Sequence, residues 1–252
     1  KTSGELVWRT PNLGNESYTS PAIVKIDGKD HLVAVISSTN PRGRRDQPQT
    51  LGKIVGIEPL SGKILWEYDQ WECHISIASA VDAGDNKVLV AGGYELGAVM
   101  IKVEKQADGS YGTTELIRTE EFGDQTKPPL LIDGYFYAQY GTNNKREGLT
   151  CMNMDGEIMW KTKRDPAFNK GSMIYADGLI LATDGAKSLY LIQPDPSEFK
   201  LLASSEVLTA AEPADGRMAR FGTQNWAPIA LAEGKLLIRD QSRMLCLRVA
   251  EE

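Results

Sequence analysis

Short runs of apolar residues, bounded by Gly, Asp, Asn or Pro, follow one another along the chain. The first four runs are Ser20–Ile26, His31–Ser38, Gly52–Glu58 and Ile64–Tyr68. Turn signals such as Asp27-Gly28 separate them. Runs of this length, rich in β-branched and aliphatic residues, are typical of strands joined by tight turns. The pattern predicts a four-stranded antiparallel meander.

The same meander recurs along the chain, which predicts an all-β fold of about five repeat units. The predicted units span residues 9–69, 70–121, 122–165, 166–208 and 225–250, with residues 3–9 as an additional strand. The last unit has three runs instead of four. No segment has a convincing helical period, and Ser205–Arg220 is interpreted as a long loop. Repeated four-stranded meanders of about forty to fifty residues are typical of the blades of a β-propeller.

Three stretches share a turn glycine, a charge, two aliphatic residues and a tryptophan. They are Gly4-Glu5-Leu6-Val7-Trp8, Gly62-Lys63-Ile64-Leu65-Trp66 and Gly156-Glu157-Ile158-Met159-Trp160. The motif resembles the quinoprotein (PQQ-type) repeat. That resemblance implies that Trp8, Trp66 and Trp160 dock between neighbouring blades. The closing segment, from Asn225-Trp226-Ala227-Pro228 to Asp240, resembles the final blade of bacterial PQQ-like propellers.

The resemblance also implies a ring of about seven or eight blades. We therefore expect the chain to be the C-terminal part of a larger ring. The alternative is a small ring in which Leu6–Arg9 supplies the missing strand of the fifth unit. By the same resemblance, the protein is expected to be bacterial and periplasmic or otherwise extracytoplasmic.

Composition narrows the classes of function. A net charge of −6 and a pI near 5.2 argue against nucleic acid as the main partner, because phosphate binding needs a basic face. No apolar run is long enough for a transmembrane helix. Three cysteines do not make a disulfide framework. Cys151 and Cys246, each inside an apolar run, are interpreted as core residues.

The longer, more polar connections are predicted to share one face of the propeller, here called the loop face, where binding residues are usually placed. The candidate ligand or partner residues on this face are Arg42, Arg44, Trp71, Glu72, His74, Asp184, Trp226, Arg239 and Asp240. The arginines are suited to bind a carboxylate or an anionic glycan, and Trp71 and Trp226 offer aromatic surface. His74 is the only plausible general base, whereas His31 is interpreted as a solvated structural residue.

The quinoprotein resemblance raises an enzymatic alternative. Quinoprotein dehydrogenases hold PQQ over a calcium ion with Glu, Asn and Asp ligands, above a tryptophan, and many have a disulfide between adjacent cysteines. This chain has no Cys-Cys pair. Trp226 or Trp71 could form the floor, and Glu72, Asn225 or Asp184 could reach an ion, but no ordered motif links them. We therefore assign no catalytic residue, metal ligand or cofactor.

The favoured interpretation is a non-catalytic binding or scaffold propeller that holds a protein or glycan partner on its loop face. The first alternative is a PQQ- and calcium-dependent dehydrogenase acting on alcohols or sugars. The second is a carbohydrate-binding propeller that uses loop aromatics as sugar platforms. The same repeat supports both enzymes and inert scaffolds, so fold alone does not choose between them.

Overall fold

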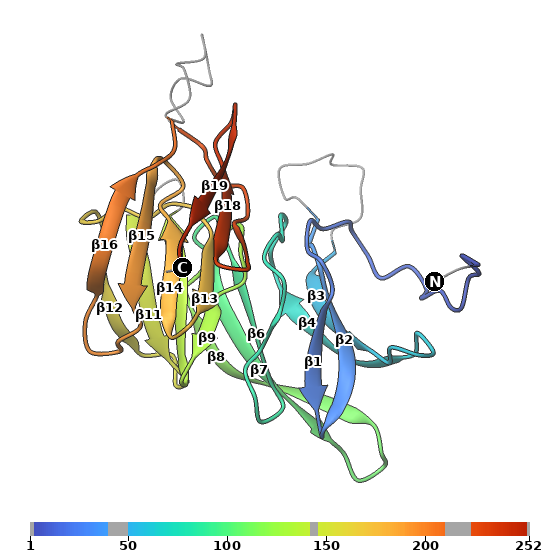
Figure 1. Cartoon of the computed structure of the whole chain (residues 1–252). Coiled ribbons are helices and arrows are strands. Elements are labelled where there is room, and N and C mark those ends of the chain that lie inside the picture. The colour runs from blue at the N-terminus through green and yellow to red at the C-terminus, as the bar shows by residue number, and fades with distance from the viewer. Residues whose placement is uncertain (1–2, 40–49, 142–145, 210–222, 251–252) are drawn as a thin grey trace. The chain divides into compact units, whose positions relative to one another are not determined.

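The computed structural model describes residues 3–39, 50–141, 146–209 and 223–250, and its regular elements are β-strands (Figure 1). They form four four-stranded sheets and one three-stranded sheet, each antiparallel with sequential strands as neighbours. The predicted all-β fold of about five blade units is confirmed. The chain divides into two compact halves, Lys1–Pro128 and Pro129–Glu252.

The N-terminal half contains two complete sheets. The first sheet comprises β1 (Ala22–Ile26), β2 (Lys29–Ile36), β3 (Gly52–Ile57) and β4 (Ile64–Trp71). The second comprises β5 (Val81–Asp82), β6 (Lys87–Gly92), β7 (Gly97–Lys105) and β8 (Tyr111–Thr119).

The C-terminal half contains the other three sheets. The third comprises β9 (Leu130–Ile132), β10 (Tyr135–Gly141), β11 (Arg146–Asn153) and β12 (Ile158–Lys161). The fourth comprises β13 (Met173–Ala176), β14 (Leu179–Thr183), β15 (Ser188–Gln193) and β16 (Lys200–Glu206). The fifth has β17 (Ala230–Ala232), β18 (Lys235–Arg239) and β19 (Met244–Arg248).

Two-residue turns join the first and second strands of four sheets. They are Asp27-Gly28, Asp133-Gly134, Asp177-Gly178 and Glu233-Gly234, and both residues of each have positive φ. Such a pair fits a type I′ turn, whose twist matches that of the flanking strands. These turns mark one end of the sheets, here called the turn end.

The hydrophobic core lies between the sheets. One cluster joins the first two sheets through Val33, Trp66 and Val99, among others. Another joins the third and fourth sheets, and a smaller cluster joins the fourth and fifth. Within each half, neighbouring sheets therefore bury their faces against each other, as in a repeat protein.

The third and fourth strands of the four complete sheets share one irregularity, a register shift of one residue. The pairs that precede the shift are Gly56–Trp66, Met100–Ile117, Cys151–Trp160 and Leu191–Ala203. The shift is a β-bulge in the fourth strand. Trp66, Ile117, Trp160 and Ala203 therefore occupy one equivalent position, here called the docking position.

Trp160 at the docking position of the third sheet reaches the fourth sheet. Its indole Nε1 donates to the carbonyl of Asp195, 2.9 Å away, in the turn between β15 and β16. Its ring lies 5.8 Å from that of Phe199 in the same turn. Trp8 makes the matching bond to the Pro59 carbonyl between β3 and β4, also 2.9 Å.

Trp66 behaves differently, because its Nε1 donates to Nδ1 of His31 in its own sheet, 2.9 Å away. His31 is only 1% exposed, so its interpretation as a solvated residue is wrong. Gly56 leaves room for the indole, since a Cβ there would lie 2.0 Å from the ring.

Cys246 also departs from expectation. It is exposed, because it lies on β19 at the edge of the three-stranded sheet, whereas Cys151 is buried as predicted. Residues 3–9 form no strand in the structure, although Trp8 makes its contact with the first sheet.

Candidate functional site

In each sheet, the end opposite the turn end is here called the loop end, and the connections predicted for the loop face lie there. Arg42 and Arg44 lie outside the described residues. The other candidates fall into two groups, one in each half of the chain.

In the N-terminal half, Trp71 is not a displayed aromatic. Strand β4 continues past Tyr68 and pairs Trp71 with Gly52, which buries the indole to 1% exposure. Its Nε1 donates to Oγ of Ser76, 3.2 Å away. The prediction that Trp71 is exposed is therefore wrong, because strand β4 ends three residues later than the apolar pattern indicated.

The residues that follow Trp71 alternate between exposed and buried. Glu72 is exposed, and the Cys73 thiol is buried, which raises its pKa. His74 is half-buried, and its ring centroid lies 5.5 Å from that of Tyr94. Glu72 and His74 are thus available for contacts at the loop end of this half.

In the C-terminal half, Asp184 closes the turn between β14 and β15. Its Oδ1 accepts the backbone N–H of Ala186 at 2.7 Å and that of Ser188 at 3.1 Å. An aspartate in this position stabilises the turn by satisfying backbone donors. Asp184 therefore has a structural role within the described chain.

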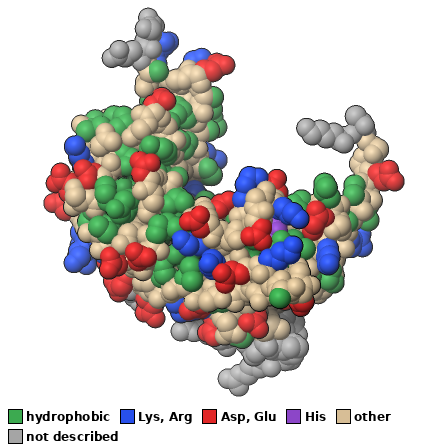
Figure 2. All heavy atoms as spheres, turned by 90° about the horizontal axis from the view of Figure 1, so that it is seen from below, with side chains coloured by type: hydrophobic (Ala, Val, Ile, Leu, Met, Phe, Trp, Pro, Cys, Tyr) green, Lys and Arg blue, Asp and Glu red, His purple; other side chains and the backbone are tan. Residues whose placement is uncertain are grey.

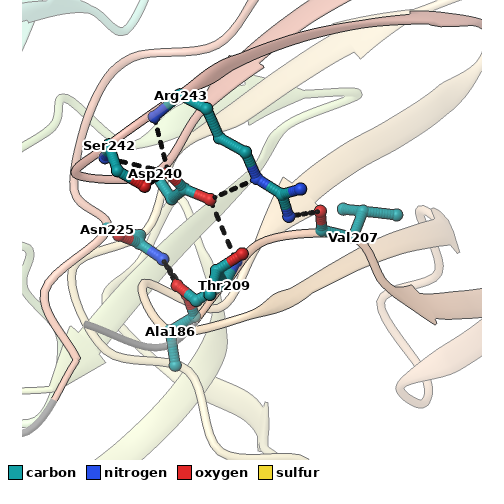
Figure 3. Close-up of polar contacts among 7 residues, drawn as sticks. All are labelled: Ala186, Val207, Thr209, Asn225, Asp240, Ser242 and Arg243. Carbon is teal, nitrogen blue, oxygen red and sulfur yellow. Dashed lines mark hydrogen bonds and ion pairs between the residues drawn. The ribbon is translucent and has the colours of Figure 1, made fainter. Parts of the chain in front are cut away.

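Asp240 has the same role in the next sheet (Figure 3). Its Oδ1 accepts from the backbone of Ser242 and Arg243, and its Oδ2 accepts from the Thr209 backbone and Arg243 Nε at 3.0 Å each. These hydrogen bonds, chiefly the one from the Ser242 backbone, hold the pKa of the Asp240 carboxyl well below its usual range. Arg239, beside it, is exposed.

Asn225 ties the two turns together. Its Nδ2 donates to the carbonyls of Ala186 (Figure 3) and Thr209. Its backbone N–H donates to the Gly185 carbonyl. Asn225 is 3% exposed, and its Oδ1 has no hydrogen-bond partner. The side chain therefore supports the loop end and is poorly placed to bind an exposed ligand.

Lys170 is a residue that the sequence reasoning missed. Its Nζ lies 4.6 Å from the centre of the Trp226 ring, within the range of a cation–π contact. Burial lowers the pKa of this amine. Lys170 has left-handed backbone (φ 57°), and the next residue, Gly171, donates its N–H to Oε1 of Gln139. A single lysine in a loop has no sequence pattern that would predict its contact with Trp226.

The structure therefore brings Asp184, Trp226 and Asp240 to the loop end of the C-terminal half, around Asn225 and Lys170. Across the described residues, no group of three or more His, Cys, Asp or Glu side chains is close enough to hold a metal ion. Trp71 is buried and Asp184 accepts backbone donors in a turn, so the described residues do not present these two candidates freely to PQQ or calcium. Nor does the described chain contain a helix long and apolar enough to cross a membrane.

Successive sheets of antiparallel strands, each a meander of neighbours in sequence, define the chain as β-propeller blades. Two solved structures show the same fold. BamB from Moraxella catarrhalis matches with a TM-score of 0.50 and 10% identity, over 92% of this chain and 58% of that one. AztD from Citrobacter koseri matches with a TM-score of 0.50 and 16% identity, over 92% of this chain and 56% of that one.

The resemblance to the PQQ-like propeller repeat is confirmed as a likeness of fold. The chain spans little more than half the length of either solved structure. No protein-family model and no curated protein matches the sequence.

Proposed function

We propose that this chain is a non-catalytic binding module that holds a protein partner at its loop end. The proposal rests on one observation: some charged candidate residues hold turns, whereas others are exposed to solvent. The carboxylates of Asp184 and Asp240 accept hydrogen bonds from backbone N–H groups, as structural turn residues do. By contrast, Glu72 and Arg239 are exposed at the same end of their sheets.

Exposed charged side chains on a rigid β-scaffold favour recognition, because the scaffold fixes their positions before a partner arrives. The propeller fold of BamB and AztD is compatible with this role. By the same resemblance, we propose a bacterial, extracytoplasmic location, which fractionation of cells expressing the full-length protein would test.

Site-specific photo-crosslinking tests the binding site. Benzoylphenylalanine would replace Glu72 and, in a separate variant, Arg239. Control variants would carry it at the turn end in place of Lys63 or Glu198, which are also exposed. We expect protease-sensitive adducts from a bacterial envelope extract at the loop-end positions alone. Equal labelling at all four positions, or none at the loop end, would contradict the proposal.

The PQQ alternative is tested by titrating the protein with PQQ and calcium while following tryptophan fluorescence. Saturable, calcium-dependent quenching at micromolar PQQ would overturn the non-catalytic assignment. A crosslinked adduct that resists protease and is removed by glycosidases would instead favour the carbohydrate-binding alternative.

A further inference from the structure

An apolar groove opens between the fourth and fifth sheets and runs from the turn end of the C-terminal half to Leu189 and Ser205. Its volume is about 480 Å³, within the range of small-molecule and side-chain pockets. The wall from the fourth sheet includes Leu181, Leu191 and Ala203, and the wall from the fifth includes Leu231, Val249 and Ala250. Its lining includes none of Lys170, Asp184, Trp226 and Asp240, so the groove is distinct from the loop-end site.

The two faces of the fourth sheet differ in burial. Ile180, Ala182 and Ile192 face the third sheet and are fully buried. Their neighbours Leu181 and Leu191, which face the groove, are only half-buried. Strand β16 is exposed along its whole length. On the face of the molecule shown in Figure 2, hydrophobic side chains lie in patches among charged ones.

The docking position of the fourth sheet carries a small residue that lines the groove. Ala203 occupies the docking position of the fourth sheet, which holds Trp66 in the first sheet and Trp160 in the third. Between the third and fourth sheets, the Trp160 indole lies between Tyr137 and Phe199 and fills the corresponding space. An alanine leaves that space open beside Leu191, its cross-strand neighbour.

The backbone carbonyl that accepts the indole hydrogen bond also has an equivalent position after β19. Trp160 donates to the carbonyl of Asp195, the second residue after β15 ends at Gln193. Ala250 is the second residue after β19 ends at Arg248, and it lines the groove. The groove thus repeats the apolar walls of a space that elsewhere in this chain holds an indole, together with the equivalent backbone position.

We propose that this groove binds the tryptophan side chain of a protein partner. The indole lies against Leu191 and Ala203, in the place of the missing docking tryptophan, and its N–H donates to the Ala250 carbonyl. Tryptophan is suited to such a site because it buries a large flat apolar surface and needs one hydrogen-bond acceptor. This inference goes beyond the proposed function and does not depend on it.

The test uses the whole chain and N-acetyl-5-fluorotryptophanamide as the probe, followed by ¹⁹F NMR. We expect a saturable shift with the wild-type protein. Ala203→Trp, which supplies the indole from within the chain, should weaken probe binding at least tenfold and raise the melting temperature. The matched control is Leu202→Trp, which adds an indole at the bulge, where residue 202 is 48% exposed, and should bind like wild type.

A second variant covers the case in which Ala203→Trp does not fold. Leu191→Asn makes the groove wall polar and should also weaken the probe about tenfold while the far-UV circular dichroism is unchanged. Absence of saturation with wild type, or undiminished binding by folded Ala203→Trp or Leu191→Asn, would overturn the proposal. Photo-crosslinking at Glu72 and Arg239 reports on the other end of the sheets, so either proposal can fail while the other stands.

Discussion

At the scale of single residues, the buried His31 is a pH-sensitive support of the first sheet. Burial lowers its pKa below 6.5, and its Nδ1 accepts the Trp66 N–H, so folding favours the neutral imidazole. The unfolded chain therefore binds more protons between the two pKa values. Stability from this contact is fully present above about pH 6.5 and is lost as the pH falls toward the folded pKa.

We expect His31→Gln to cost about 1 kcal/mol of unfolding free energy at pH 7.5, from the lost hydrogen bond. The difference from wild type should shrink as the pH is lowered below about 6.5. Urea unfolding at several pH values measures it. His74→Gln, which removes the chain's other histidine, is the control. A difference independent of pH would show that His31 does not titrate with folding.

Asp240 gives a second residue-scale prediction, with a lower pH window. Its folded pKa lies below the usual carboxyl value, so the stabilisation is present above about pH 4 and is lost as the pH falls below it. Asp240→Asn should lower the melting temperature at pH 7 by a few degrees, and the deficit should narrow in acid. Scanning calorimetry measures both, with the exposed turn variant Asp177→Asn as the control. A deficit of the same size at pH 3 and pH 7 would refute the assignment.

At the scale of elements, the docking position should matter more than the bulge residue beside it. Trp160 joins two sheets, whereas Met159 is 39% exposed. Trp160→Ala should cost about 3 kcal/mol, through lost burial and the cavity left behind. Met159→Ala should cost less than about 1 kcal/mol. Denaturant unfolding compares the two, and equal losses would mean that the indole contributes little to the contact between sheets.

Strands could be predicted from sequence because each carries a local signal, namely an apolar run ended by a turn pair such as Asp27-Gly28. The candidate site could not, because its geometry depends on where strands end and pair. Trp71 follows Tyr68 in what reads as a loop, yet its pairing with Gly52 buries it. Lys170 and Trp226 are 56 residues apart in sequence (226 − 170), and only folding brings them together.

At the scale of the whole molecule, protection from hydrogen exchange should vary from sheet to sheet, because the strands differ in how deeply they are buried. Strand β7 is buried over most of its length, from Ala98 to Ile101 without interruption. Strand β19 alternates between exposed and half-buried and lies at a sheet edge. Hydrogen exchange followed by mass spectrometry should show β19 exchanging about a hundredfold faster than β7. Similar rates would indicate that the sheets open together.

Because the sheets share the register shift, the residue at the docking position of one sheet can in principle be exchanged for that of another. At this position Trp160 fills the space between the third and fourth sheets, whereas Ala203 leaves a groove between the fourth and fifth. A single substitution at this position could therefore convert a filled contact between sheets into an open groove, or the reverse, without altering the strands. A propeller of this kind can gain or lose a binding surface through mutation at one repeated position. A designer can create such a groove by choosing which sheet carries the small residue.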